Sequence, residues 1–322
     1  MRSIAIGKYR GLQQCANAKG GFSILALDHR NNLRRLLQLD ESDKNSAGRM
    51  AAFKRSIVST LSPVSSAFLL DPLYGAAQSV AASALPGNVG LLVALEKTGY
   101  TGDPTARSSQ ILPGWGVDKI KRMGASAVKL LVYYHPDSPT HATIEDLVKT
   151  TAEDCHKEDI PLFVEILTYA LDPEQKKLSG QERQDVILAA AERLTPLGVD
   201  ILKAEFPLDF KQDTDLNHWR KACRRLTKVS CVPWILLSAS VDFETYLEQV
   251  IAACTSGASG VAVGRAVWKE AVEHEGKDLD HFLQITALER MRKVSSVVDA
   301  LAVPWMKYFS PSPVSDEWYR TY

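Results

Sequence analysis

The chain contains the stretch Val199-Asp-Ile-Leu-Lys-Ala-Glu-Phe-Pro207, in which a lysine interrupts an apolar run. If this run is a strand, Lys203 and Glu205 share one face, because successive side chains of a strand alternate sides. Pro207 ends it, since proline cannot donate to a sheet ladder. A lysine in a packed interior must be paired or neutral. The stretch therefore indicates either a Schiff-base nucleophile or a structural Lys203–Glu205 ion pair.

Seven further short apolar runs lie before and after this stretch in the sequence. The segments that follow the runs have apolar residues at helical spacing. The runs occupy residues 22–27, 67–70, 90–95, 125–132, 161–167, 232–237 and 260–263. Continuous apolar strands that alternate with helices are typical of a parallel sheet buried on both faces. Eight such units, without a dinucleotide fingerprint after the first, predict an α/β fold of the (β/α)₈ barrel type. We expect one barrel domain over residues 1–309 and a short C-terminal tail over residues 310–322.

The composition excludes several classes of partner. The 322 residues include 38 Lys and Arg against 38 Asp and Glu, so no overall field attracts nucleic acid or an anionic membrane. No apolar run approaches membrane length or has the form of a signal peptide. The five cysteines are scattered, which predicts free thiols in a reducing compartment and a cytoplasmic protein. They are Cys15, Cys155, Cys223, Cys231 and Cys254.

Polar and charged residues stand within or at the ends of the predicted strands. In a barrel of this type, catalytic groups come from the C-terminal ends of the strands. A rim with only a structural role would not need so many charged residues at the strand ends. The pattern therefore predicts an enzyme. The residues are Asp28, Asp71, Glu96, Lys97, Lys129, Glu165, Lys203, Glu205, Ser238, Gly264 and Arg265.

Several of these residues have two interpretations. Asp28 either acts in catalysis, or caps its loop or pairs with Arg30. Lys129 lies in the apolar context Ala-Val-Lys-Leu-Leu, so it is either the nucleophile or a cation that keeps its neighbour neutral. Ser238 and Arg265 end the seventh and eighth strands, where barrels often bind phosphate, although Arg265 alternatively pairs with a rim carboxylate.

The histidines do not have the spacing of metal ligands. We therefore expect no metal and no other cofactor, with carboxylate-bound Mg²⁺ left open. The histidines are His29, His135, His141, His156, His218, His274 and His281.

Eight motifs together resemble the class I tagatose 1,6-bisphosphate aldolases and their relatives, the sulfofructose-phosphate aldolases. The resemblance runs in order from about residue 21 to residue 301. The motifs are Leu25-Ala-Leu-Asp-His-Arg30, Leu69-Leu-Asp-Pro-Leu-Tyr-Gly75, Glu96-Lys-Thr-Gly-Tyr100, Val128-Lys-Leu-Leu-Val-Tyr-Tyr134, Phe163-Val-Glu-Ile-Leu-Thr-Tyr169, Leu202-Lys-Ala-Glu-Phe-Pro207, Pro233-Trp-Ile-Leu-Leu-Ser-Ala239 and Gly257-Ala-Ser-Gly-Val-Ala-Val-Gly-Arg-Ala-Val-Trp268.

The resemblance implies a metal-independent barrel aldolase. It implies that Lys203 forms the Schiff base, that Glu165 is the acid and base, and that Lys129 lies beside them. Asp28 is implied to be an active-site residue. His29 departs from the family pattern, which usually has glutamine after that aspartate. The residues implied to bind substrate and phosphate are His29, Leu237, Ser238, Gly264 and Arg265.

The sequence is therefore interpreted as a class I aldolase that acts on a phosphorylated ketose. The expected substrate is tagatose 1,6-bisphosphate, and the expected products are dihydroxyacetone phosphate and glyceraldehyde 3-phosphate. One alternative is a sulfofructose-phosphate aldolase that gives dihydroxyacetone phosphate and sulfolactaldehyde. Another, of a different class, is a catalytically idle barrel that binds sugar phosphate and regulates a partner. Assembly into a homo-oligomer is left open.

Overall fold

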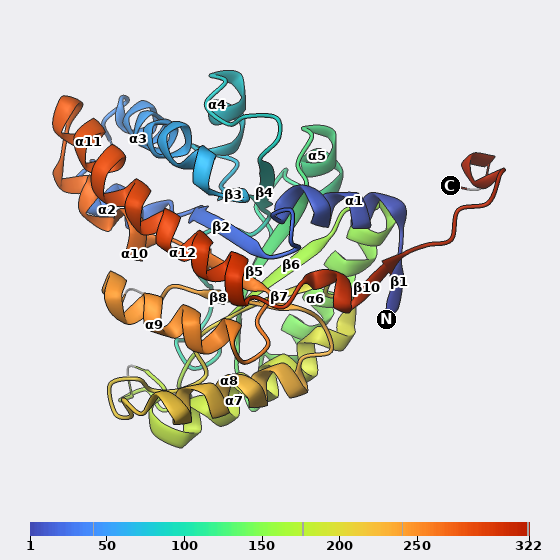
Figure 1. Cartoon of the computed structure of the whole chain (residues 1–322). Coiled ribbons are helices and arrows are strands. Elements are labelled where there is room, and N and C mark those ends of the chain that lie inside the picture. The colour runs from blue at the N-terminus through green and yellow to red at the C-terminus, as the bar shows by residue number, and fades with distance from the viewer. Residues whose placement is uncertain (41, 176, 240, 321) are drawn as a thin grey trace.

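A computed structural model describes residues 1–40, 42–175, 177–239, 241–320 and 322. Its centre is a closed barrel of parallel strands, in which each strand pairs with the next in the sequence and β9 pairs with β2 (Figure 1). The predicted (β/α)₈ fold is confirmed. The strands are β2 (Phe22–Leu27), β3 (Ala67–Leu70), β4 (Gly90–Ala94), β5 (Ala127–Tyr134), β6 (Leu162–Thr168), β7 (Ile201–Ala204), β8 (Trp234–Leu237) and β9 (Gly260–Val263).

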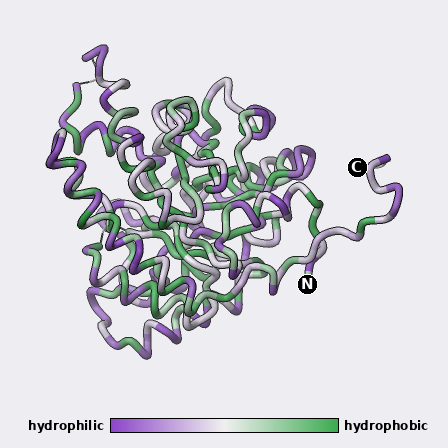
Figure 2. The backbone as a smooth tube through the Cα atoms, turned by 45° about the horizontal axis from the view of Figure 1, so that its top comes forward, coloured by the Kyte–Doolittle hydropathy of each residue, from purple (hydrophilic) through white to green (hydrophobic). Residues whose placement is uncertain are grey.

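Helices form the outer layer and turn an apolar face toward the barrel. Along these helices hydrophobic residues alternate with hydrophilic ones, whereas the central strands are largely hydrophobic (Figure 2). The helices are α1 (Ile6–Cys15), α2 (Asn31–Leu36), α3 (Ser46–Leu61), α4 (Ala76–Ala81), α5 (Val117–Arg122), α6 (His141–Lys157), α7 (Gly180–Leu194), α8 (Leu216–Val229), α9 (Phe243–Cys254), α10 (Arg265–Trp268), α11 (Gly276–Phe282) and α12 (Leu288–Leu301).

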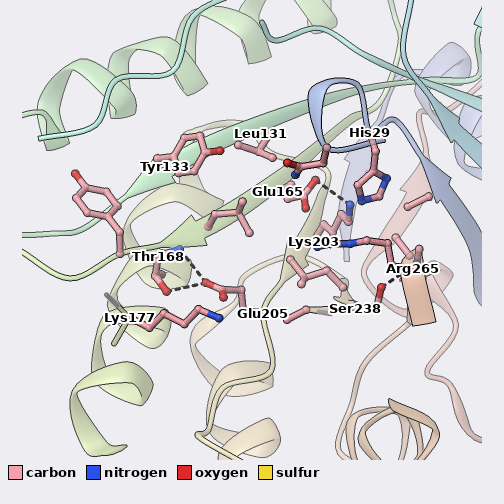
Figure 3. A pocket seen from close by; sticks show the side chains of 18 of the residues that line it. His29, Leu131, Tyr133, Glu165, Thr168, Lys177, Lys203, Glu205, Ser238 and Arg265 are labelled. Atoms are coloured by element: carbon pink, nitrogen blue, oxygen red, sulfur yellow. Dashed lines mark hydrogen bonds and ion pairs between the residues drawn. The ribbon is translucent and has the colours of Figure 1, made fainter. Parts of the chain in front are cut away.

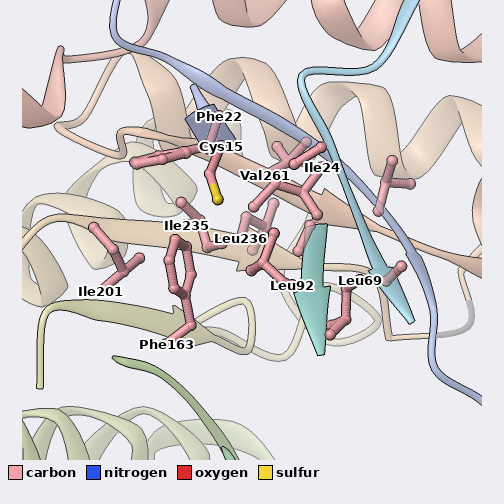
Figure 4. Close-up of a cluster of buried hydrophobic side chains, with 14 of the residues drawn as sticks. Cys15, Phe22, Ile24, Leu69, Leu92, Phe163, Ile201, Ile235, Leu236 and Val261 are labelled. Carbon is pink, nitrogen blue, oxygen red and sulfur yellow. The ribbon is translucent and has the colours of Figure 1, made fainter. Parts of the chain in front are cut away.

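Buried apolar side chains fill the interior of the barrel (Figure 4). Phe22 and Phe163 meet edge to face, with ring centroids 5.7 Å apart. Helix α1 packs on the end of the barrel where the strands begin. The approach is so close that a Cβ atom at Gly11 would lie 2.4 Å from the carbonyl oxygen of Ser126. Cys15 at the end of α1 is buried beside the barrel, and burial raises the pKa of its thiol. The barrel interior is therefore a packed core at this end and not a pore.

The ends of the chain contain structure that the sequence did not predict. Strand β1 (Arg2–Ile4) pairs in parallel with β10 (Phe309–Pro311), and the segment after β10 extends away from the barrel (Figure 1). Near the C-terminus, α11 is followed by a π-helical turn at Leu283–Ala287 and then by α12. Pairing of residues that lie about 300 positions apart leaves no local pattern.

Two further predictions concern membrane-spanning segments and thiols. Among the described residues, no helix is long and apolar enough to cross a membrane. All five cysteines are free, as predicted; Cys231 is exposed and the others are buried.

Asp200, directly before β7, is a buried carboxylate that ties the N-terminus to the barrel. It accepts hydrogen bonds from Lys8 Nζ at 2.7 Å and from Arg2 Nη2 at 2.8 Å. It also accepts the backbone N–H of Leu162, the first residue of β6, at 2.9 Å. Lys8 and Asp200 are both buried, so neither charge is well hydrated without the other.

We predict that Asp200→Ala lowers the free energy of unfolding by about 3–5 kcal/mol, because the Lys8 ammonium loses its buried partner. Urea unfolding followed by circular dichroism measures the change. Asp154→Ala is the matched control, because Asp154 pairs with Lys157 on an exposed face of α6. It should cost about 1 kcal/mol or less. Equal effects in the two variants would contradict a stabilising role for the Asp200 cluster.

Candidate active site

A cavity of about 840 Å³ opens at the C-terminal ends of the strands (Figure 3). All of the residues predicted to act in catalysis or substrate binding line it, although they come from six different strands or the loops that follow them. These residues are Asp28, His29, Lys129, Glu165, Lys203, Leu237, Ser238, Gly264 and Arg265. Asp71 is an exception among the strand-end groups, because it pairs with Lys54 in the protein interior.

Lys129, on β5, is enclosed by three carboxylates. Its Nζ atom lies 2.7 Å from Asp28 Oδ2, 2.7 Å from Glu96 Oε1 and 3.0 Å from Glu165 Oε2. The side chain is 1% exposed. Burial alone would lower the pKa of Lys129, but the carboxylates outweigh burial and hold that pKa well above its ordinary value. Lys129 is therefore a fixed cation.

Lys203, on β7, has a different environment. Its Nζ donates to Glu165 Oε2 at 2.8 Å. Glu165 and Lys203 are partners across the β6–β7 ladder, so their side chains emerge side by side. Burial alone would raise the pKa of Glu165, but the ammonium groups of Lys129 and Lys203 outweigh burial and lower it. Glu165 is thus an ionised carboxylate shared between two lysines.

Asp28 follows β2 and faces the same cluster. Burial would raise its pKa, but Lys129 and Lys203 outweigh burial and hold that pKa well below its ordinary value. The alternative pairing of Asp28 with Arg30 is wrong. Arg30 instead donates to the backbone carbonyl of Glu96 at 2.6 Å, while Asp28 accepts from Lys129.

Glu205 does not pair with Lys203, so the structural ion pair considered from the sequence is also wrong. Its Oε2 accepts the backbone N–H and the hydroxyl of Thr168 at 2.8 and 2.7 Å. Its Oε1 accepts from Arg183 Nη2 at 3.1 Å. Glu205 lies just past the end of β7, where the chain leaves the regular strand. It therefore anchors β6 and α7 at the cavity wall.

The ends of β8 and β9 form a second part of the cavity. The backbone N–H of Gly264 donates to Ser238 Oγ at 2.9 Å. Arg265 forms no ion pair with any carboxylate that the structure describes, and its Nε is buried without a hydrogen-bond partner there. The alternative of a rim ion pair for Arg265 is therefore not supported. A guanidinium and a hydroxyl next to backbone amides are suited to an anion.

His29 follows Asp28 directly and also lines the cavity. Its ring meets the Trp268 ring edge to face, with centroids 5.2 Å apart, and its Nδ1 is buried without a hydrogen-bond partner among the described residues. Burial, opposed by Asp28 and assisted by Arg265, lowers the pKa of His29 to about 4. Its imidazole is therefore neutral near pH 7.

Sequence reasoning missed two features of the site. Lys54 on α3 is fully buried, pairs with Asp71 and donates to the backbone carbonyl of His29 at 2.9 Å. Arg107, in the loop after β4, lies against three tyrosines. Lys54 stands in an ordinary amphipathic helix, and Arg107 in a polar loop, so neither position carries a local signal.

No group of three or more His, Cys, Asp or Glu side chains in the described part of the chain is arranged to hold a metal ion. The point where three carboxylates converge is filled by the Lys129 ammonium group. That the reaction needs no metal remains a prediction.

Comparison with known proteins places the chain among aldolases. A sequence model described as the DeoC/LacD family of aldolases matches residues 22–270. The chain is 31% identical to tagatose 1,6-diphosphate aldolase 2 of Streptococcus mutans, over 94% of this chain and 98% of that protein. It is 31% identical to the tagatose 1,6-diphosphate aldolase of Listeria monocytogenes serotype 4a, over 95% of each chain.

Two solved structures share the fold. An archaeal fructose 1,6-bisphosphate aldolase superposes with a TM-score of 0.60 at 22% identity, over 90% of this chain and 98% of that one. A fructose-bisphosphate aldolase from Plasmodium falciparum superposes with a TM-score of 0.70 at 16% identity, over 94% and 98% of the two chains.

We predict that His29 makes the folded protein less stable as the pH falls from 6.5 to about 4. The unfolded chain binds a proton at His29 near pH 6.5, whereas the folded protein binds it near pH 4, so acid favours unfolding across this window. Between about pH 7 and pH 5, His29→Gln should therefore lose about 1–2 kcal/mol less of its free energy of unfolding than the wild type.

Urea unfolding at the two pH values measures the difference. His281→Gln, at an exposed position of α11, is the matched control. Identical pH dependence in wild type and His29→Gln would show that His29 takes up its proton equally in both states.

Proposed function

The chain belongs to the DeoC/LacD family of aldolases, and from that premise we propose that it cleaves tagatose 1,6-bisphosphate through a Schiff base on Lys203. The products are dihydroxyacetone phosphate and glyceraldehyde 3-phosphate. The protein is thus an aldehyde-lyase of class I. Two relatives named tagatose 1,6-diphosphate aldolase, each aligned over nearly the whole chain, support this substrate.

The contrast between the two lysines carries the assignment of the nucleophile. Lys129 directs its ammonium group at three carboxylates, which leaves no N–H free and stabilises the charged form. Among the residues that the structure describes, Lys203 forms an ion pair with Glu165 alone, and it borders the cavity. A Schiff base requires a neutral amine that can approach a carbonyl carbon. Lys203 meets this requirement after it gives one proton to Glu165.

The reaction then follows from these positions. The Lys203 amine attacks C2 of the ketose, and Glu165 returns a proton to the C2 oxygen to give a carbinolamine. Loss of water gives the iminium ion. Glu165, now a carboxylate again, takes the proton of the C4 hydroxyl as the C3–C4 bond breaks, and the electron pair of that bond moves into the iminium to form an enamine as the aldehyde leaves. Glu165 then gives the proton to C3, and hydrolysis of the iminium by water releases dihydroxyacetone phosphate and free Lys203.

Lys129 and Asp28 support these steps by charge. The Lys129 cation holds Glu165 and Asp28 in place and stabilises them as carboxylates, so Glu165 is available as a base at the start of each turnover. Ser238 and Arg265 lie next to Lys203 (Figure 3) and bind the phosphate on C1, and the Gly264 amide holds Ser238 Oγ in position. Leu237 and His29 complete the wall of this subsite.

We predict that borohydride reduction in the presence of substrate labels Lys203. Peptide mapping of the reduced wild-type protein tests this directly, because it does not depend on the folding of any variant. Lys203→Met should abolish both turnover and labelling. Lys129→Met is the matched control and should retain labelling at Lys203 even where turnover falls. A label on the peptide that carries Lys129, and none on that carrying Lys203, would reverse the roles of the two lysines.

We also predict that Arg265→Ala weakens substrate binding. A charge-assisted bidentate contact contributes about 1.5–3 kcal/mol, so KM should rise about tenfold or more. Steady-state kinetics measures the change. Arg290→Ala, which removes a partly exposed arginine paired with Glu270 outside the cavity, should leave KM unchanged. An unchanged KM in Arg265→Ala would locate the C1 phosphate elsewhere.

A further inference from the structure

We propose that Arg107 and the tyrosines around it bind an anionic group at the far end of the substrate, the phosphate on C6 of the ketose. We call Arg107, Tyr100, Tyr133 and Tyr169 the Arg107 clamp. The proposal rests on the proposed function and extends it, because the subsite at Arg265 accounts for the phosphate on C1 alone.

The tyrosine rings fix the plane of the guanidinium group. Arg107 Cζ lies 4.5 Å from the ring centroid of Tyr100, 4.7 Å from that of Tyr169 and 5.7 Å from that of Tyr133. The rings of Tyr100 and Tyr133 also meet edge to face at 5.1 Å. Stacking on aromatic faces stabilises a guanidinium and leaves its N–H edge available to an acceptor.

Hydrogen bonds fix the rest of the residue. Arg107 Nε donates to the carbonyl oxygen of Pro104 at 2.9 Å, and the backbone N–H of Arg107 donates to Tyr169 Oη at 3.3 Å. The carbonyl oxygen of Arg107 accepts from Thr140 Oγ1 at 2.9 Å. The terminal Nη nitrogens have no hydrogen-bond partner in the part of the chain that the structure describes. Their N–H groups can donate two parallel hydrogen bonds to one phosphate, which is the geometry of bidentate binding.

The loop that carries Arg107 is held against the barrel. Antiparallel bridges pair Thr101 with Ser108 and Glu96 with Ile111. Ser109 Oγ accepts the backbone N–H of Tyr133 on β5 at 3.0 Å. These contacts join the loop to the strand that carries Lys129. The position of Arg107 is therefore set relative to the reacting groups before a ligand arrives.

Tyr133 and Tyr169 of the Arg107 clamp line the same cavity as Arg265. Figure 3 shows Tyr133 and Arg265 toward opposite sides of the view, with Lys203 between them. Arg107 lines the same cavity, as do Lys97 and Lys177. A ketose joined to Lys203 through C2 holds its C1 phosphate close to Lys203, while its C6 substituent reaches toward the other end. Two cationic ends separated by the reacting lysine therefore match a ketose with an anion at each end.

The recognised chemistry is a tetrahedral oxyanion on C6, either a phosphate or a sulfonate. Arg107→Ala should lower kcat/KM about tenfold or more for tagatose 1,6-bisphosphate and leave kcat/KM for tagatose 1-phosphate unchanged. Arg265→Ala should impair both substrates, because both carry the C1 phosphate. Assay of sulfofructose 1-phosphate separates the two oxyanions: the substrate that loses more activity in Arg107→Ala is the one that the clamp binds. Arg122→Ala, which removes an exposed arginine of α5, is the matched control.

Binding without chemistry separates this proposal from the proposed function. Hexitol 1,6-bisphosphate and hexitol 1-phosphate lack the carbonyl, so calorimetric titration reports binding whether or not the protein is an aldolase. The wild type should bind the bisphosphate about tenfold or more tightly than the monophosphate, and Arg107→Ala should remove this preference. Equal affinities in the wild type, no binding of either compound, or a preference that persists in Arg107→Ala would overturn the proposal.

Discussion

The Lys129 ammonium group, held among Asp28, Glu96 and Glu165, is the interaction on which the site depends. An ammonium group cannot be buried in a barrel without compensation, because the loss of hydration costs several kcal/mol. Three carboxylates around one cation also leave excess negative charge. Lys203 offsets part of it through Glu165 at 2.8 Å, so the two lysines and three carboxylates form one electrostatic unit.

This unit joins strands that are distant in the sequence. Its members come from β5, β6 and β7 and from the segments directly after β2 and β4. Closure of the barrel brings these segments around one axis, and the apolar side chains beneath them exclude water (Figure 4). Where water is excluded, the electrostatic interaction between neighbouring charges is stronger than it would be in solution. The same interior that stabilises the fold therefore makes Lys129 a permanent cation and keeps Glu165 ionised.

The loops add selectivity to this rigid base. Ser238, Gly264 and Arg265 follow the last two strands directly, so their positions are nearly as fixed as those of the strands. Arg107 lies on a longer loop, where bridges and stacked tyrosines supply the rigidity that a strand would otherwise give. A rigid anion site costs less entropy on binding than one that must be ordered by the ligand.

The sequence by itself determined the eight strands, their parallel order and the set of polar residues at the open end. These features are local: an apolar run of strand length and the residue that ends it are both visible within a few positions. The sequence left three pairings open, namely those of Asp28, Glu205 and Arg265. Each depends on distances across the closed barrel, which no spacing along the chain reports.

The tertiary structure alone decided how the two buried lysines differ. Lys129 and Lys203 both interrupt apolar strands and look alike in the sequence, but one faces three carboxylates and the other forms an ion pair with one. The Lys54–Asp71 pair and the Arg107 clamp arise in the same way, from side chains that meet only after the helices and loops pack on the barrel. The charge state of a group depends on its neighbours in space, and those neighbours are set by the closure of the barrel.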